Sequence, residues 1–165
     1  MTSVAFFRNL NQGQRGHVTT AQLVDAFVVS GAIGVRPVRA NGTVIFTADN
    51  TEECLSTALA QLHGASAWAD VAFARGAAWL AERVSEFPAN VAPPLTELSL
   101  FEGRLAHPLP MGGKGCSVVR AGDGYAVTVN DSPGTSQATP TLERALGTPV
   151  TSRSATTLRL VLDAM

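Results

Sequence analysis

The chain has little of the residue types that mark a specialised chemistry or compartment. It contains 2 cysteines, 3 histidines and 1 tyrosine among 165 residues, and its only lysine is Lys114. Charged residues make up 15% and the formal net charge is −1, which excludes a highly charged disordered chain and the basic balance of a dedicated nucleic-acid binder. No apolar stretch approaches the ~18 residues that cross a bilayer, so we expect no membrane span.

The cysteines and the start of the chain bear on its compartment. The first residues form no basic cluster, and the apolar run Val4–Phe7 is much shorter than that of a signal peptide. Without a sign of secretion, Cys54 and Cys116 are expected to be free thiols in a reducing compartment. We therefore predict a cytoplasmic protein.

The histidines and carboxylates form no recognisable catalytic or metal-binding pattern. His17, His63 and His107 lie far apart, and no cysteine pair accompanies them. The carboxylates are scattered, without a pair placed for acid–base catalysis. We expect neither a metal nor a cofactor, and the sequence leaves open whether the chain is an enzyme.

Hydrophobic periodicity predicts a regular first half. The expected segments are a strand at 4–8, a helix after Thr19 or Thr20, strands at 35–39 and 43–47, a helix after Thr51, and a strand at 68–74. Asn41-Gly42 lies between two β-rich runs and predicts a hairpin. This order predicts a ferredoxin-like, split β-α-β arrangement, in which two helices cover one face of an antiparallel sheet.

The second half is predicted to be a smaller α+β unit. After a third helix at 76–87 and a proline-rich segment at 88–94, we expect a strand at 95–101, a loop at 102–115, a hairpin of 116–121 and 125–130 around Gly122-Asp123-Gly124, and helices at 140–146 and 154–164. We therefore divide this α+β protein into sub-domains at 1–90 and 91–165.

The polar segment from Arg8 to His17 is the densest polar cluster in the chain. It leaves a strand and leads to a helix N-terminus, where free backbone N–H groups and the helix dipole favour anions. Arg8 and Arg15 add cations suited to phosphate or carboxylate groups. An ordinary surface loop, in which Asn side chains bond the backbone, is the alternative.

Two other features suggest a function and are weakened by their context. The stretch Met111–Ser117 contains three glycines and a lysine like a phosphate loop, but it leads into a strand rather than a helix. A small basic patch in residues 1–48 would suit single-stranded nucleic acid only if Phe6, Phe7 or Phe46 were exposed. The sequence therefore argues against nucleic acid as a partner.

Three blocks of the sequence resemble one bacterial family. The opening VAFFRNLNQG at 4–13 is similar to VALLRGINVG of the family called domain of unknown function 1697. The hairpin at 35–46 is similar to its VRTYIQSGNVVF, and LGTPVTSR at 146–153 is similar to its LGTPATTR. Asn9 stands where the family has glycine, and Ser154 stands near the position of a family tryptophan.

The resemblance implies a two-part α+β protein with a ferredoxin-like first half, and it implies no particular activity. Polar loop residues on rigid elements are natural binding groups. Together with the polar segment, the blocks supply six candidate ligand-binding residues: Arg8, Asn11, Arg15, Asn41, Thr151 and Arg153. Structural roles, such as capping or turn formation, are the alternative for each.

Three functions remain open at this level. We favour a binding or regulatory module for a small anionic ligand or a protein partner. The alternatives are a hydrolase or transferase with a site near the Arg8–His17 loop, and a single-stranded nucleic-acid binder. An exposed sheet edge at Val35–Arg39 also makes a homodimer an alternative.

Overall fold

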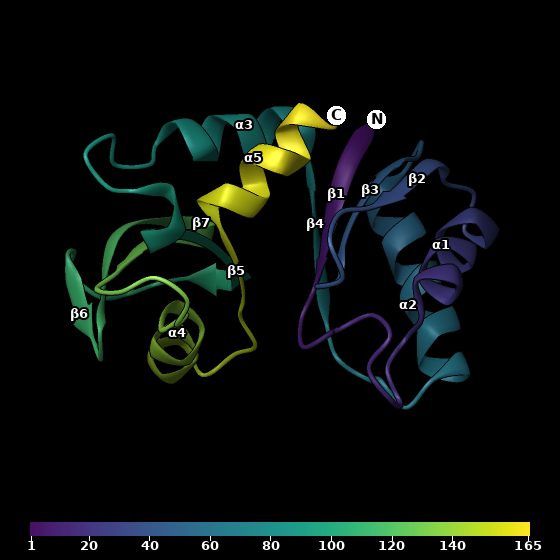
Figure 1. Cartoon of the computed structure of the whole chain (residues 1–165), viewed down its shortest axis with the longest axis horizontal. Coiled ribbons are helices and arrows are strands. Elements are labelled where there is room, and N and C mark those ends of the chain that lie inside the picture. Colours follow the sequence, from purple (N-terminus) through teal and green to yellow (C-terminus); the bar gives the residue numbers. More distant parts are fainter. The chain divides into compact units, whose positions relative to one another are not determined.

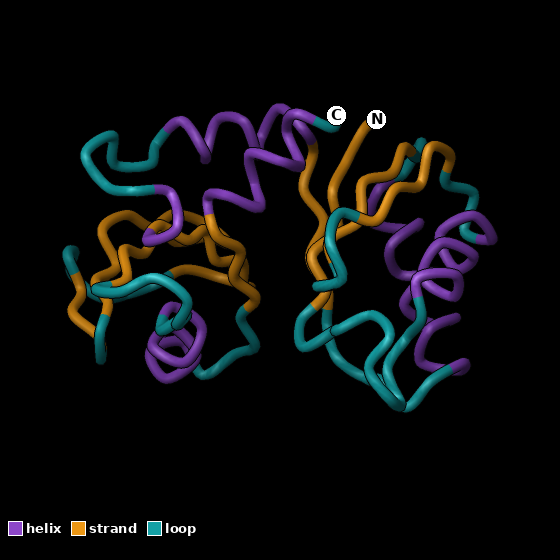
Figure 2. Tube along the Cα trace, in the orientation of Figure 1, coloured by secondary structure: helices purple, strands orange, loops and turns teal.

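Two antiparallel four-stranded sheets and five α-helices make up the fold in a computed structural model that describes all 165 residues (Figures 1 and 2). The α+β class is as predicted. The chain divides into two units, of which the first comprises 1–80 and 161–165 and the second 81–160. The first boundary falls between Leu80 and Ala81, ten residues before the predicted boundary at 90, and the last five residues join the first unit.

The first unit contains the six elements that the sequence predicted, in the predicted order. They are β1 (Thr2–Phe7), α1 (Thr20–Val29), β2 (Ile33–Pro37), β3 (Thr43–Thr47), α2 (Thr51–Ala65) and β4 (Ala72–Gly76). The strands form a sheet in the order β2-β3-β1-β4, with β1 antiparallel to both of its neighbours. The central strand β1 is thus the first in the chain.

Side-chain caps define where the two helices of this unit begin. Thr19 accepts a hydrogen bond from the Gln22 backbone, and the Gln22 side chain accepts one from the Thr19 backbone, which is a capping box. Helix α2 begins at Thr51 rather than after it, and Asn50 caps it by accepting from the Glu53 N–H. Glu52 and Glu53 then lie in the first turn, where the helix dipole favours carboxylates.

The core of the first unit lies between the sheet and the two helices. Phe7 of β1 contacts Phe27 of α1 edge-on at 6.0 Å, and Phe27 contacts Phe46 of β3 at 4.7 Å between ring centroids. Phe6 on the other face of β1 is also buried. None of these four rings is exposed, so none provides the stacking surface that single-stranded nucleic acid needs.

The second unit is built on the other sheet, in the order β6-β7-β5-β8. Its elements are η1 (Pro93–Leu95), β5 (Thr96–Arg104), β6 (Met111–Gly113), β7 (Cys116–Asn130), α4 (Ala138–Leu146) and β8 (Thr151–Ser154). Leu142 of α4 packs with Phe101 and Ala126 of the sheet to form the core on one face. Helices α3 (Ala77–Ser85) and α5 (Ala155–Asp163) each run across a boundary between the units.

The predicted hairpin around Gly122-Asp123-Gly124 is wrong. Residues 116–130 form one long strand, β7, which pairs with β6 at its start and with β5 along its second half. The φ of +73° at Gly124 and the register shift between Leu100 and Arg104 show that the glycines bend the ladder without reversing the chain. Strand β6 lies within the segment that we predicted as a loop. Strand β8 lies mainly between the two helices that we predicted at 140–146 and 154–164.

Candidate functional site

Arg8 and its surroundings form an ion-paired corner of the first unit. The Arg8 guanidinium donates to a carboxylate oxygen of Asp70 at 2.7 Å, and Asn9 donates to the same oxygen at 2.9 Å. The Trp68 indole N–H donates to the Arg8 carbonyl at 3.0 Å. The cation expected to attract an anion is therefore neutralised by a carboxylate.

The other three candidates of the first unit lie in loops, and two of them form hydrogen bonds there. The Asn11 backbone donates to His17 Nδ1 at 3.3 Å, and its side chain donates to Gln14. The Asn41 side chain accepts from the Thr43 hydroxyl at 2.9 Å. Arg15 is exposed and makes no hydrogen bond, so it alone keeps an uncommitted charged group.

Thr151 and Arg153 are neighbours on β8 of the second unit. The Arg153 guanidinium donates to the Thr151 hydroxyl and to the Ser152 carbonyl, both at 2.9 Å. Burial lowers the pKa of Arg153 to about 10, and the charge of Glu97 opposes this shift. The six candidates thus divide between the units, four in the first and two in the second.

Glu97, a residue that the sequence analysis did not single out, is the most unusual polar group of the second unit. It is only 7% exposed although it is a carboxylate on a sheet strand. Strand register places it directly opposite Thr128 of β7 and Ser154 of β8. Buried carboxylates are rare without compensating donors, so its partners decide what it does.

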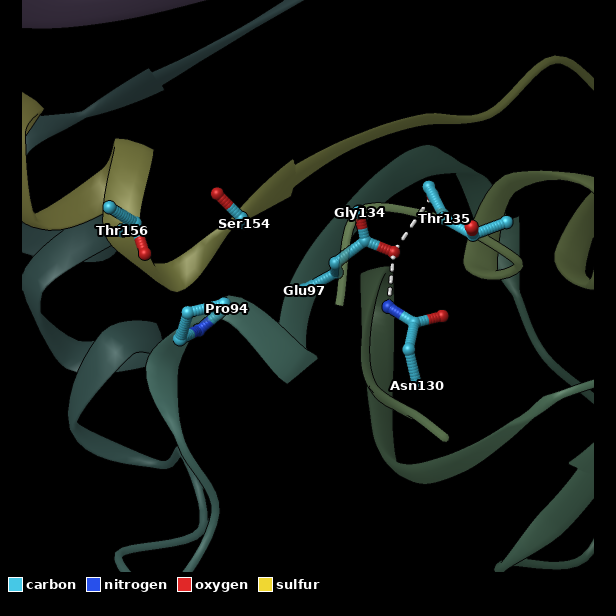
Figure 3. A pocket seen from close by; sticks show the side chains of 8 residues that line it. Pro94, Glu97, Asn130, Gly134, Thr135, Ser154 and Thr156 are labelled. Atoms are coloured by element: carbon cyan, nitrogen blue, oxygen red, sulfur yellow. Dashed lines mark hydrogen bonds between the residues drawn. The ribbon is translucent and has the colours of Figure 1, made fainter. Parts of the chain in front are cut away.

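Both hydrogen bonds to Glu97 reach the same oxygen. The Asn130 amide donates to Oε2 at 2.9 Å, and the Ser136 hydroxyl donates to Oε2 at 2.8 Å (Figure 3). No group of the chain donates to Oε1. A carboxylate oxygen can accept two hydrogen bonds, so Glu97 keeps an unused acceptor. The neighbouring Thr128 hydroxyl is also buried without a partner.

A cavity of about 300 Å³ adjoins Glu97. Figure 3 shows Ser154 and Thr156 on one side of Glu97, and Thr135 on the other. The lining residues are Pro94, Glu97, Asn130, Gly134, Thr135, Ser136, Ser154 and Thr156. Apart from the proline and glycine, each of them has a side chain that can form hydrogen bonds.

Hydrogen bonds hold this wall of the cavity in place. The Asn130 Oδ1 accepts from the Gln137 N–H at 3.1 Å, which ties the end of β7 to the start of α4. On the same face, the Ser152 hydroxyl is within 2.7 Å of Ser99 and 2.8 Å of Thr139. A site supported by such a network is preorganised before a ligand arrives.

A pattern in the sequence could have pointed to this site. Glu97 and Ser99 occupy alternate positions of β5, with Leu98 between them and Leu100 after them. An acid and a serine on one face of a strand mark that face as polar. Their polar partners on β7 and β8 were not recognised, because β8 was not predicted and β7 was predicted as a hairpin.

Other classes of site have little support in the structure. No group of three His, Cys, Asp or Glu side chains is placed to hold a metal ion. None of the helices is both long enough and apolar enough to cross a lipid bilayer. Both cysteines are free and buried, and burial raises the pKa of the Cys54 thiol, which disfavours its reactive thiolate form.

Comparison with known proteins identifies the fold and no activity. A solved structure, that of the conserved bacterial protein SP0830 from Streptococcus pneumoniae, is similar with a TM-score of 0.65 and 12% sequence identity. The similarity covers 98% of this chain and 97% of that one. No family model matches the chain, and no curated protein matches it. The comparison therefore supports the α+β fold alone.

Proposed function

We propose that the protein is a binding module for a small polar ligand and that its site is the Glu97 cavity. The unused acceptor of the buried Glu97 carboxylate is the observation that supports this most strongly. Glu97 is 7% exposed and lines the cavity, so a ligand bound there can donate a hydrogen bond to Oε1.

The chemistry of the cavity favours a ligand that donates hydrogen bonds. A carboxylate attracts ammonium, amide and hydroxyl groups and repels an anion placed beside it. Hydroxyls of Thr135, Ser154 and Thr156 surround it and both donate and accept. The volume of about 300 Å³ is at the small end of ligand sites, so it suits a metabolite of a few heavy atoms.

This proposal keeps the binding module favoured by the sequence and changes its place and its ligand. The Arg8–His17 segment was expected to attract an anion, but Asp70 neutralises Arg8. The second unit instead presents a carboxylate to its cavity, which favours cationic or neutral donors.

The test uses the full-length, isotope-labelled chain, with amide NMR spectra recorded during titration. The probes are ethylamine as a cationic donor, glycerol as a neutral donor and propionate as an anion. We expect ethylamine or glycerol to shift the amide signals of residues 130–136. The Glu97→Gln variant should weaken that binding by about tenfold, since a charged hydrogen bond is replaced by a neutral amide.

The matched control is Glu102→Gln. Glu102 lies on the same strand, is exposed, and forms no hydrogen bond or ion pair, so the change removes the same charge outside the cavity. Its binding should equal that of the wild type. If neither ethylamine nor glycerol shifts these signals, or if Glu97→Gln binds them as well as the wild type does, the proposed site is wrong.

The finer identity of the chain is also a proposal. Membership of the domain of unknown function 1697 family is supported by three sequence blocks in the same order. The strand order β2-β3-β1-β4 and the helices α1 and α2 support a ferredoxin-like first unit. Two free cysteines support a cytoplasmic location.

A further inference from the structure

Strand β2 is an edge of the sheet in the first unit, and one side of its backbone has no neighbouring strand. The order β2-β3-β1-β4 leaves β2 paired with β3 alone. The Val38 N–H donates to the Thr43 carbonyl at 2.7 Å, so Val38 faces the β3 side. Because residues of a ladder face a given neighbour alternately, Val35 and Pro37 turn their backbone groups to the free side. Val35 thus offers a donor and an acceptor there.

Helix α1 presents apolar side chains beside this free edge. The helix contacts β2 on the sheet and α2 on its other side. Gln22 and Ala26 line a hollow that α1 shares with α2. Helical spacing places Val24 and Val28 on the opposite side of α1, above the free edge of β2. Val28 is 55% exposed, so an apolar surface there remains uncovered.

Ile33 adds an apolar side chain on the other face of the sheet. It pairs with Thr47, whereas Phe46 is the neighbour that packs among the helices, so Ile33 lies on the face without them. Its side chain is 70% exposed. A charge on an edge strand normally opposes pairing, but the Arg36 guanidinium already donates to the Ala164 carbonyl.

The two ends of this edge carry opposite charges. Arg39 follows the end of β2, and Asp49 follows β3 beside the start of β2. Both are exposed, and neither forms a hydrogen bond or an ion pair. If two copies of β2 pair antiparallel about Val35, Arg39 of one copy lies two strand spacings, about 10 Å, from Asp49 of the other. An arginine side chain can cover most of that distance.

We infer that the free edge of β2 binds a second copy of this chain and forms a symmetric dimer. Antiparallel pairing joins the two four-stranded sheets, and the Val35 backbone groups bond to each other across the twofold axis. Val28 and Ile33 lose contact with water on the two faces, and each Arg39 meets the Asp49 of the other copy. The charges favour a second copy over an unrelated strand, and the inference is independent of the Glu97 cavity.

The first test is sedimentation equilibrium of the full-length chain from about 1 μM to about 1 mM, the range in which weak interfaces dissociate. We expect the apparent mass to rise toward twice that of the monomer. Amide hydrogen exchange, measured by NMR over the same range, locates the contact. The Val35 amide should exchange more slowly as the concentration rises, because only the dimer gives it an acceptor.

A lysine at Ile33 tests the apolar part of the contact. Ile33→Lys places two like charges near the twofold axis and should weaken dimerisation by about tenfold or more. Val119→Lys is the matched control, since Val119 is an exposed apolar strand residue of the second unit. The control should dimerise as the wild type does, and amide spectra of both variants show whether the fold is retained.

A charge exchange tests the alignment of the two copies. Arg39→Asp and Asp49→Arg each create two like-charge contacts and should weaken dimerisation severalfold. Asp tolerates the φ of +61° at position 39. The double variant restores opposite charges across the axis and should dimerise like the wild type. Within one chain these residues lie at opposite ends of the edge, so loss of a role in the monomer would not be rescued.

Each measurement can overturn the inference. A chain that stays monomeric at about 1 mM does not pair through β2. A dimer in which the Val35 amide exchanges as in the monomer, or which Ile33→Lys leaves intact, uses another surface. A double variant that dimerises no better than the single variants rules out the antiparallel alignment.

Discussion

Gly42 shows how closely two parts of the first unit approach each other. Its φ is +68°, and a Cβ atom added there would lie 2.8 Å from Phe7 Cβ and 2.9 Å from Leu10 Cβ. Both contacts involve buried residues close to the backbone, so neither neighbour can move aside easily. We expect Gly42→Ala to lower the free energy of unfolding by about 2–4 kcal/mol, from backbone strain plus overpacking.

Gly13 provides the matched control for this measurement. Its φ is +83°, and a Cβ atom there would meet nothing within 4 Å. Gly13→Ala therefore carries the backbone strain alone, about 1–2 kcal/mol. Urea unfolding of both variants checks the difference, and equal losses would show that the approach of Phe7 and Leu10 to Gly42 does not limit the fold.

Arg8 was the leading site residue in the sequence, and the structure gives it a structural role. Its partner Asp70 also accepts from Asn9 and from the Val71 N–H, so losing Arg8 leaves that carboxylate partly satisfied. We expect Arg8→Met to lower the free energy of unfolding by about 1 kcal/mol and to leave binding in the Glu97 cavity unchanged.

Arg15→Met is the corresponding control, because Arg15 is exposed and forms no hydrogen bond. Its effect on stability should stay within about 0.5 kcal/mol. Thermal unfolding measures the stability of both variants, and the ethylamine titration measures their binding in the Glu97 cavity. A loss of ethylamine binding in Arg8→Met would return the site to the loop that the sequence favoured.

At the scale of elements, β6 passes very close to helix α4. A Cβ atom on Gly113 would lie 2.6 Å from the Thr141 side chain and 2.9 Å from Cys116 Sγ. Gly112, one residue earlier on the same strand, has nothing within 4 Å. We expect Gly113→Ala to cost about 1–3 kcal/mol and Gly112→Ala much less, as measured by urea unfolding. Similar losses would contradict the close approach.

The first unit shows which parts of the fold could be predicted from the sequence. In the first unit, alternation and capping residues predicted every element, because each pattern is local and the Asn41-Gly42 segment does close a hairpin. In that hairpin the positive φ values belong to Arg39 and Gly42, so Asn41 is not a left-handed residue of the turn.

In the second unit the decisive interactions are not local. The glycines of Met111–Ser117 permit a turn and a close helix contact, which sequence spacing alone cannot distinguish from a phosphate loop. Gly122 and Gly124 bend a strand that β5 continues to pair. The candidate site depends on the pairing of β5 with β7 and β8. Glu97 could therefore not be recognised as a site residue from a sequence in which β8 was not predicted.

At the scale of the whole molecule, each unit carries one buried cysteine. Cys54 lies in α2 of the first unit and Cys116 begins β7 of the second. Neither thiol should react with a water-soluble alkylating reagent while its unit is folded, since burial limits access and raises the pKa of Cys54. Labelling of Cys54→Ala and Cys116→Ala variants therefore reports the opening of each unit separately.

We expect both thiols to become reactive over the same range of urea concentration. Helices α3 and α5 cross the boundaries at Leu80 and Leu160, so unfolding one unit removes the continuation of two helices from the other. Because short helices are marginal without their full length and packing, the loss destabilises the unit that remains. Pulsed alkylation followed by mass spectrometry measures both midpoints. Midpoints separated by more than about 1 M urea would mean that each unit folds without the shared helices.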